Sequence, residues 1–231
     1  MPPPRRSRPR AVAPRTTPLA LRTLPPLDPD VLAPEADIED GEVADSSWDD
    51  LDLAHANVRG ARLVALRAQR VDLTAAHLGG TALERLDAPA VRATRGGWRD
   101  VELTGSRLGS LEAYESTWDG VRIEDCRLGY VNLRGATLTD VLVTGTSLDE
   151  LDLVQATVRR AAFEGCRIGR LDVQQATLEH VDLRGAQVDD VVGVESLRGI
   201  VVTPAQLVDL AAVLARALGV VVAGPGEPIE G

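Results

Sequence analysis

The chain has 231 residues, of which 44% are hydrophobic but only 3% aromatic, so an ordinary globular core rich in aromatic side chains is not expected. Its net charge of −10 comes from 35 acidic and 25 basic residues, which argues against a chain that coats nucleic acid in general. The sequence shows neither a run of about 18 apolar residues nor a secretory leader, and it predicts a cytoplasmic protein without membrane spans. Leucine, valine and alanine supply the apolar content, which favours a narrow core built from many similar layers.

The first segment, residues 1–40, is rich in proline and shows little hydrophobic periodicity. Arginines gather over residues 5–22 and acids over residues 28–40, so the segment is neutral overall. Such a composition has too little apolar surface to offset the entropy cost of ordering, and we predict a disordered tail over residues 1–40. The alternative is a basic tail that contacts nucleic acid or an acidic partner.

A strict period of five residues begins at residue 41. Every residue whose number ends in 3 or 8, from Val43 to Val188, is apolar, and the positions two residues earlier hold only small or apolar residues. A helix repeats its face every 3.6 residues and a strand every 2, so neither keeps this register. A chain that turns a corner every five residues does keep it.

A longer period of twenty residues lies on top of the first. It is marked by a row of threonines, Thr117, Thr137, Thr157 and Thr177. Four five-residue units therefore make one four-sided coil, and successive coils stack at about 4.8 Å, the usual spacing of paired strands. Cys126 and Cys166 occupy inward positions two coils apart, about 9.6 Å, which is too far for a disulfide.

Three segments carry a resemblance to a known family. They are Val71-Asp72-Leu73, Val131-Asn132-Leu133-Arg134-Gly135-Ala136 and Val181-Asp182-Leu183-Arg184-Gly185-Ala186. These segments resemble the A-(D/N)-L-x-x unit of the pentapeptide-repeat family, and the resemblance covers residues 41–192. It implies an all-β solenoid, a right-handed quadrilateral β-helix of the loop-free type with a C-terminal helix. In that family the central residue and the residue two before it point inward, as do the two small or apolar columns found here.

After Val191 the period stops, and residues 193–231 are predicted to form a C-terminal α-helical cap and a tail. Thr203 suits the N-cap, Pro204 the first helical position and Gln206 the capping box, and Gly219 marks the end. The predicted apolar stripe of this helix consists of Leu207, Leu210, Leu214 and Leu218. A helix at this point closes the open end of the solenoid, and the resemblance implies a homodimer formed through it.

The sequence offers no catalytic, cofactor or metal site. Its three histidines, His55, His77 and His180, occupy outward positions more than one coil apart, whereas a metal site needs three or four converging ligands. Motifs of a nucleophile elbow, a phosphate-binding loop or a zinc protease are missing from the sequence. A convex rod without inserted loops also lacks the concave pocket that catalysis usually needs. We therefore predict that the chain is not an enzyme.

Function is therefore assigned to the outward faces of the predicted rod. One column forms an interrupted acidic row, which consists of Asp52, Asp72, Glu112, Asp152 and Asp172. The adjoining face carries an arginine row, which consists of Arg67, Arg107, Arg127 and Arg167. The first interpretation is a non-catalytic protein-interaction scaffold, whose charged rows pair across corners and keep the rod soluble.

The alternative interpretation follows from the resemblance. Some pentapeptide-repeat proteins bind DNA gyrase or topoisomerase IV as acidic, duplex-shaped rods, and they protect these enzymes from quinolones and related poisons. The acidic row would then imitate DNA phosphates, with Asp152 and Asp172 pointing outward to the partner. The arginine row departs from this pattern, because duplex DNA presents negative charge on every side.

Overall fold

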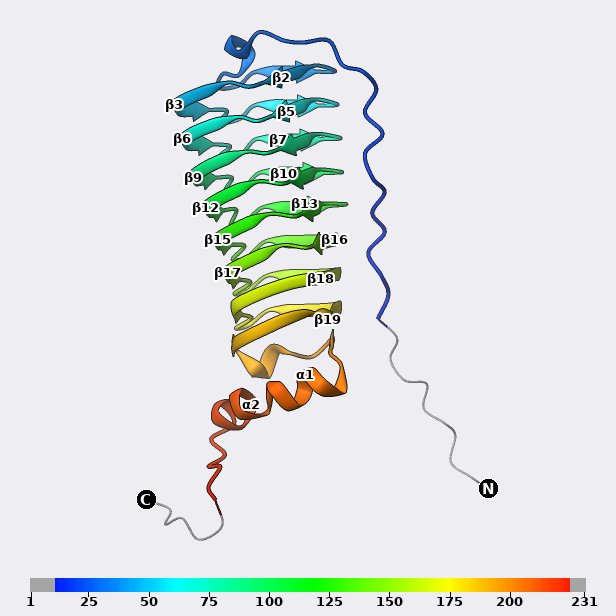
Figure 1. Ribbon diagram of the computed structural model, residues 1–231, viewed down its shortest axis with the longest axis vertical. Helices are drawn as coiled ribbons and strands as arrows, with labels where there is room; N and C mark the ends of the chain where they lie inside the picture. Colours follow the sequence, from blue (N-terminus) through cyan, green and yellow to red (C-terminus); the bar gives the residue numbers. More distant parts are fainter. Residues whose placement is uncertain (1–10, 225–231) are drawn as a thin grey trace, which may run out of the picture.

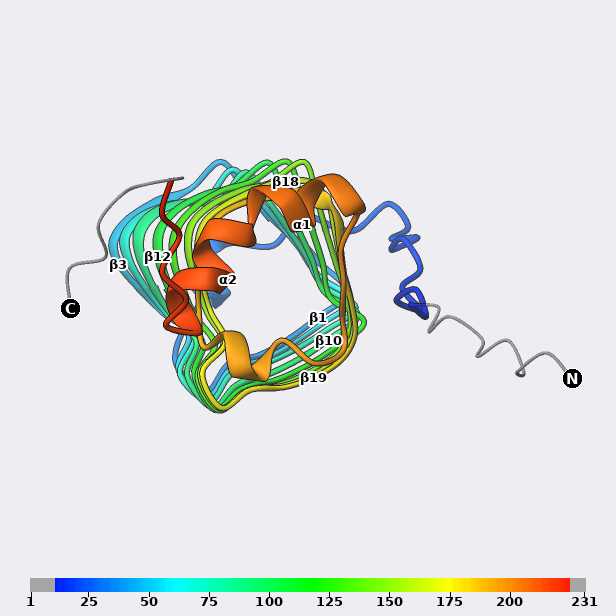
Figure 2. The ribbon, with the colours of Figure 1, turned by 90° about the horizontal axis from the view of Figure 1, so that it is seen from below.

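Over residues 37–172, each strand pairs in parallel with the strand about twenty residues later. In the computed structural model, which describes residues 11–224, this pairing stacks the chain into a four-sided solenoid (Figures 1 and 2). Trp98, for example, pairs with Leu78 in one neighbouring coil and with Trp118 in the other. The twenty-residue period of the sequence is therefore one coil, and the predicted all-β solenoid is confirmed.

The four faces of the solenoid are defined by their central, inward residues. Face 1 is centred on Ile38, Val58, Leu78, Trp98, Trp118, Leu138, Val158 and Leu178. Face 2 is centred on Val43, Leu63, Leu83, Leu103, Ile123, Val143, Phe163 and Leu183. Face 3 is centred on Trp48, Ala68, Ala88, Leu108, Leu128, Leu148, Ile168 and Val188. Face 4 is centred on Leu53, Leu73, Ala93, Ala113, Leu133, Leu153 and Val173.

Short strands build faces 1 and 2 in the first coils, and longer ones run through the corners in the last coils. Face 1 contains β1 (Asp37–Glu39), β4 (Asn57–Arg59), β7 (His77–Gly79), β10 (Gly97–Arg99) and β13 (Thr117–Asp119). Face 2 contains β2 (Glu42–Ala44), β5 (Arg62–Val64), β8 (Ala82–Glu84), β11 (Glu102–Thr104) and β14 (Arg122–Glu124). Face 3 and the start of face 4 share β3 (Ser47–Asp52), β6 (Arg67–Asp72), β9 (Asp87–Arg92), β12 (Arg107–Glu112), β15 (Arg127–Asn132) and β17 (Ser147–Asp152). The strands that pass corners are β16 (Thr137–Thr144), β18 (Thr157–Asp172) and β19 (Thr177–Val192).

Three of the four corners are turned by a residue in the left-handed backbone region. Ala65 and Arg85, both with φ of 53°, show that even residues with a Cβ adopt this conformation here. It costs roughly 1–2 kcal/mol per residue. The N–H of Ala65 donates to the carbonyl oxygen of Glu84 in the next coil at 2.8 Å, so the stacked coil helps to offset that cost. Extended strands such as β6 cross the corner between faces 3 and 4 instead.

The interior of the rod is filled by the two inward columns of the sequence. Cys126 and Cys166 are both buried and free, as predicted. Burial raises the pKa of the Cys126 thiol to about 11, so this cysteine is a neutral core residue at ordinary pH. Trp98 and Trp118 stack with ring centroids 4.8 Å apart and an angle of 7° between their planes. Adjacent coils therefore meet through their side chains as well as through backbone pairing.

The segment before the solenoid differs from the disordered tail predicted for residues 1–40. Residues 11–24 run along the outside of the rod, and a 3-10 helix, η1 (Pro29–Val31), lies over its first coil (Figure 1). Leu32 is buried in the hydrophobic core, and the Leu27 N–H donates to the carbonyl oxygen of Glu42 at 2.7 Å. The segment also contacts a residue distant in sequence, because the Leu19 N–H donates to Glu102 Oε1, and local periodicity does not reveal such a contact. Residues 1–10 lie outside the described residues, so the prediction remains a prediction there.

At the other end, the chain closes the solenoid with η2 (Val194–Ser196), β20 (Ile200–Val201) and two short helices, α1 (Pro204–Asp209) and α2 (Ala211–Ala217). The predicted capping box is present, with Thr203 as the N-cap and Gln206 as its partner. The Gln206 Nε2 group also donates to the carbonyl oxygens of Leu183 at 2.5 Å and Ala186 at 2.6 Å. The helix therefore provides hydrogen-bond donors for two backbone carbonyl groups of the last coil. Within residues 11–224 no helix is long and apolar enough to span a membrane.

Candidate partner-binding surfaces

The acidic row predicted from the sequence is a real column on face 4. Backbone pairing places Asp52 over Asp72 and Asn132 over Asp152, with Asp172 next below. Arg92 and Glu112 lie between the two halves of the column in the same register. The sequence therefore predicted correctly which side chains align, while their role in binding a partner stays a prediction.

Most carboxylates of this column hold the turn that follows them. The N–H two residues later donates to the side chain in each case, at 2.9 Å for Asp52, 2.8 Å for Asp72, 3.0 Å for Asp152 and 3.1 Å for Asp172. Asn132 accepts the same bond from the Arg134 N–H at 3.1 Å. An aspartate or asparagine at this position favours the turn because its side-chain oxygen replaces a missing backbone acceptor. The acidic row is therefore in part a structural feature of the coil.

The lower end of the column is not free to meet a partner, which corrects the expectation that Asp152 and Asp172 point into solvent. Asp152 is 1% exposed and accepts hydrogen bonds from Arg134 Nε at 2.7 Å and Tyr130 Oη at 3.2 Å. Burial and the nearby charge of Asp152 raise the pKa of the Tyr130 hydroxyl. Asp172 is 6% exposed and accepts from the side-chain amide of Gln174. Neighbouring long side chains cover both carboxylates, although their backbone positions face outward.

The upper end of the column keeps accessible carboxylates in a shallow groove of about 460 Å³. Asp52 is exposed and Glu112 half-buried, and both line this groove. Two arginines also line the groove. Arg70 binds Asp50 through two hydrogen bonds of 2.6 and 2.9 Å, and Arg92 lies 3.8 Å from Asp72. The groove therefore has mixed charge, and among its acids Asp52 and Glu112 lie outside these two arginine pairs.

The arginine row lies on face 3, as predicted, and its members differ in their partners. Arg167 pairs with Asp189 at 2.9 Å, whereas Arg107 and Arg127 face each other in adjacent coils and form no ion pair within residues 11–224. Like charges that face each other across paired strands are destabilising. This part of face 3 has mixed charge, because Asp87 lies beside Arg107 in the same register and Asp149 lines the same surface.

Elsewhere, opposite charges pair vertically from coil to coil. Arg62 on face 2 lies 3.4 Å from Glu42 in the coil before and 3.1 Å from Glu84 in the coil after. Asp140 and Arg160 form a pair with bonds of 2.6 and 2.7 Å, which holds the pKa of the Asp140 carboxyl below its usual range. Pairs of this kind neutralise many acids of the rod, so its net charge overstates the charge on any one face.

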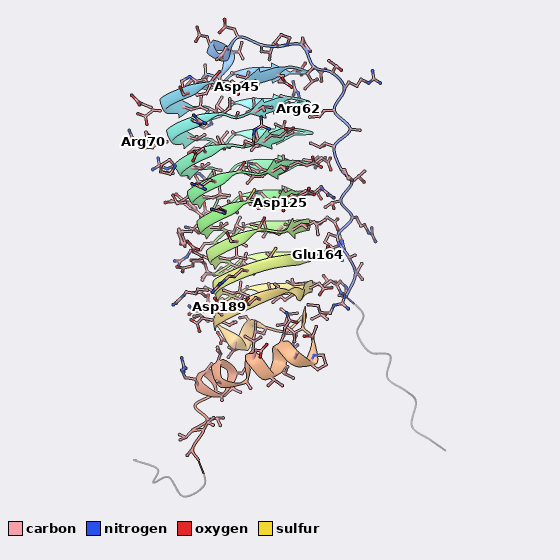
Figure 3. All side chains as sticks on the ribbon, viewed as in Figure 1. Asp45, Arg62, Arg70, Asp125, Glu164 and Asp189 are labelled. Atoms are coloured by element: carbon pink, nitrogen blue, oxygen red, sulfur yellow. The ribbon has the colours of Figure 1, made fainter. Side chains whose placement is uncertain are left out.

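Sequence reasoning missed a further surface, the strap, which we define as residues 11–24 lying on face 2 and its corner with face 1. The Arg15 N–H donates to Asp140 Oδ1 and the Leu19 N–H to Glu102 Oε1, both at 2.8 Å. Arg122 Nη1 donates to Thr16 Oγ1 at 3.4 Å. Figure 3 shows Glu164 on the strap side of the rod and Arg70 on the opposite side.

A signal for the strap was present in the sequence. The outward column that precedes the central residues of face 2 holds Ala82, Leu142 and Ala162 among charged residues. Ala82 is 4% and Ala162 is 5% exposed, although neither belongs to an inward column. Apolar side chains at outward positions indicate that another part of the molecule covers the face.

The geometry defines the class of protein as a parallel β-solenoid whose coils consist of four five-residue units. Residues 126–165 match the family model of pentapeptide repeats as eight copies. The same spacing of buried residues continues through the coils on both sides. The solenoid is therefore built of pentapeptide repeats, which confirms the resemblance found in the sequence.

Two solved structures illustrate the similarity. HetL, a pentapeptide repeat protein involved in heterocyst differentiation regulation from the cyanobacterium Nostoc sp. strain PCC 7120, is 20% identical, with 69% of this chain and 85% of that chain covered and a TM-score of 0.32. Trypsin-treated QnrB1, a plasmid-mediated fluoroquinolone resistance protein, is 15% identical, with 80% of this chain and 100% of that chain covered and a TM-score of 0.36. The comparison with curated proteins found no match. At these identities and TM-scores, neither structure carries an inference about what this chain binds.

Proposed function

We propose that the chain is a non-catalytic protein-interaction scaffold, in which a partner binds along the outward faces of the rod. The observation that carries this proposal is the continuity of the faces, because no inserted loop interrupts the coils between β1 and β19. Outward side chains repeat at about 4.8 Å along each face, and solenoids use such extended surfaces for binding. Arg107 and Arg127 on face 3 and Asp52 and Glu112 on face 4 present different charged groups on adjacent faces, which favours one orientation of a partner.

The scaffold proposal predicts that one face carries the partner. Three double variants each change one face: Asp52→Arg with Glu112→Arg on face 4, Arg107→Glu with Arg127→Glu on face 3, and Thr117→Arg with Thr137→Arg on face 1. Cross-linking in an extract of the source cells, followed by mass spectrometry, should identify a stoichiometric partner of the unaltered protein. The purified pair should lose at least about tenfold in affinity with one variant only. A partner bound equally by all three variants, or no stoichiometric partner, contradicts the proposal.

A second candidate function is binding to a bacterial type II topoisomerase, DNA gyrase or topoisomerase IV, as a mimic of DNA. The observation in its favour is that Asp52 and Glu112 remain accessible in one register on an unbroken rod. These carboxylates would dock on the cationic DNA-binding surface of the enzyme and compete with duplex. Binding of this kind would modulate the enzyme or protect it from quinolone-like poisons. Arg107 and Arg127 form no ion pair in the part of the chain that the structure describes, and these cations argue against contact of a DNA mimic through face 3.

The topoisomerase proposal predicts that the protein alters gyrase supercoiling at low salt. Asp52→Arg with Glu112→Arg should abolish the effect, because both side chains are accessible and neither is the buried Asp152. Asp49→Arg with Asp149→Arg, on face 3, makes the same change in net charge and should leave the effect in place. The effect should also weaken with salt, since charge attraction is screened within about 8–10 Å at physiological ionic strength. An unaltered protein without influence on supercoiling or on quinolone-stabilised cleavage rules this function out.

We further propose that the C-terminal cap forms a homodimer contact, a role that the sequence assigned to four leucines. The helix breaks at Leu210, which is buried in the core, and Leu214 packs partly against the core. Leu207 is 53% and Leu218 is 73% exposed, and Val208 between the two is 74% exposed. Exposed apolar side chains on a short cap are typical of a contact with another chain.

The dimer proposal predicts two molecules per particle in light scattering. Leu207→Asp with Leu218→Asp should yield monomers with an unchanged melting temperature, because both side chains lie outside the core. Leu210→Asp should instead lower the melting temperature, since this leucine is 7% exposed and closes the solenoid. A monomeric unaltered protein contradicts the dimer.

A further inference from the structure

The strap is the feature of the molecule that a regular solenoid does not need. It passes over several coils on the outside of the rod, and its backbone forms no strand pairing with face 2 (Figure 1). Each of its two backbone donors follows a proline, Pro14 before Arg15 and Pro18 before Leu19. Proline fixes its own φ near −65° and keeps the preceding residue extended. The sequence of the strap therefore favours the extended chain that the rod binds.

The acceptors on the rod match this spacing. Asp140 and Glu102 lie about two coils apart, which corresponds to about 9.6 Å along the rod. Four residues of an extended, proline-containing chain span about 12 Å, so the donors of Arg15 and Leu19 reach both carboxylates. Asp140 is 7% exposed, so the hydrogen bond that it accepts from the Arg15 N–H is largely shielded from water on the side of the rod.

Composition and apolar contact also fit. Residues 11–24 contain two arginines and no acid, and two of their backbone N–H groups bind the carboxylates of Asp140 and Glu102. Leu19, Leu21 and Leu24 are half-buried. The small Ala82 and Ala162 of face 2 leave room for a chain on the surface.

The contact is also shallow enough to be exchanged. None of residues 11–24 is fully buried, whereas the anchor at Leu27 and Leu32 packs on the first coil. Three hydrogen bonds to side chains of the rod, donated or accepted by Arg15, Thr16 and Leu19, hold the strap. The strap can therefore leave face 2 while residues 25–36 stay in place.

We propose that face 2 is a peptide-binding surface, and that residues 11–24 are its ligand in cis. The ligand class is an extended peptide without acidic residues, in which residues that follow prolines four positions apart donate their N–H groups to Asp140 and Glu102. A segment with this chemistry, supplied in trans, competes with the strap for the same surface. The inference concerns face 2 and does not depend on the partner proposed for faces 3 and 4.

Hydrogen exchange of the full-length protein, read by mass spectrometry with residue resolution, tests the first half of the proposal. The amides of Arg15 and Leu19 should exchange at least about tenfold more slowly than in a free synthetic peptide of residues 11–24. Glu102→Ala with Asp140→Ala should remove this protection, and Glu164→Ala, which changes an exposed carboxylate of the same face, should retain it. Equal exchange in the unaltered protein and the free peptide overturns the proposal.

Competition tests the second half. An isotopically heavy peptide of residues 11–24, added in excess to the full-length protein, should raise exchange of the Arg15 and Leu19 amides of the strap toward the free rate. The same peptide methylated on the backbone nitrogens of Arg15 and Leu19 should fail to do so, because it lacks both donors. Methylation at Thr17 and Ala20 is the matched control and should leave competition intact. Competition that is absent, or equal for both methylated peptides, contradicts exchange through these two donors.

Discussion

Leu133→Asp is expected to destabilise the solenoid by about 4 kcal/mol or more, the largest effect among these predictions. Leu133 is 3% exposed in the inward column of face 4, and its N–H donates to the carbonyl oxygen of Asp152 in the next coil at 2.8 Å. The substitution removes a buried apolar side chain and places a carboxylate without a partner between stacked coils. Each coil supports the next, so the damage should spread along the rod.

Urea and thermal unfolding followed by circular dichroism measure this effect. Thr137→Asp is the matched control, because it introduces the same carboxylate at an exposed outward position in the following five-residue unit. The control should change stability by no more than about 0.5 kcal/mol. If Leu133→Asp unfolds at the same urea concentration as the unaltered protein, the assignment of the inward column is wrong.

The solenoid could be predicted from the sequence because its requirement is local and repeated. Each five-residue unit must place one apolar and one small or apolar residue inward, so a break such as that after Val191 is visible at once. Alignment of the acidic row from Asp52 to Asp172 followed from the same period. The Thr203 and Gln206 capping box was also predictable, since a cap is defined within four residues.

Contacts that depend on distant residues could not be predicted in this way. Burial of Asp152 depends on Tyr130 and Arg134 of the coil above, and the repeat alone marks the aspartate only as outward. The strap lies on residues about 80 to 125 positions away, so its prolines and arginines looked like a disordered tail. The cap was predicted as one helix, yet the chain turns at Leu210 because that leucine enters the core.

The same residue type therefore plays different roles along one column. Asp52 and Asp72 hold a turn and remain partly open to solvent, whereas Asp152 holds the same turn and also joins a buried group of side chains. A test of partner binding at face 4 must use the upper residues, since changes at the lower ones alter the fold. Stability measurements can separate the two roles.

Asp152→Ala is accordingly expected to cost about 2–3 kcal/mol of folding stability, while Asp52→Ala costs about 1 kcal/mol. Both substitutions remove the turn bond to the N–H two residues later, which measures 3.0 Å at Asp152 and 2.9 Å at Asp52. Only the first also leaves Arg134 and Tyr130 without their acceptor. Arg134 is 55% exposed and regains water, which limits the loss from the ion pair.

Asp152→Asn separates the contributions further, because the amide oxygen can still accept the turn bond, as Asn132 does one coil above. The stability that Asp152→Asn loses should fall between the losses of the two alanine variants. The pKa of Tyr130, which the Asp152 charge raises, should decrease in this variant. Urea unfolding gives the stabilities, and absorbance titration of the tyrosines gives the pKa. Equal losses for Asp152→Ala and Asp52→Ala would show that the turn bond alone accounts for the aspartates of this column, and that the buried contacts of Asp152 add nothing to stability.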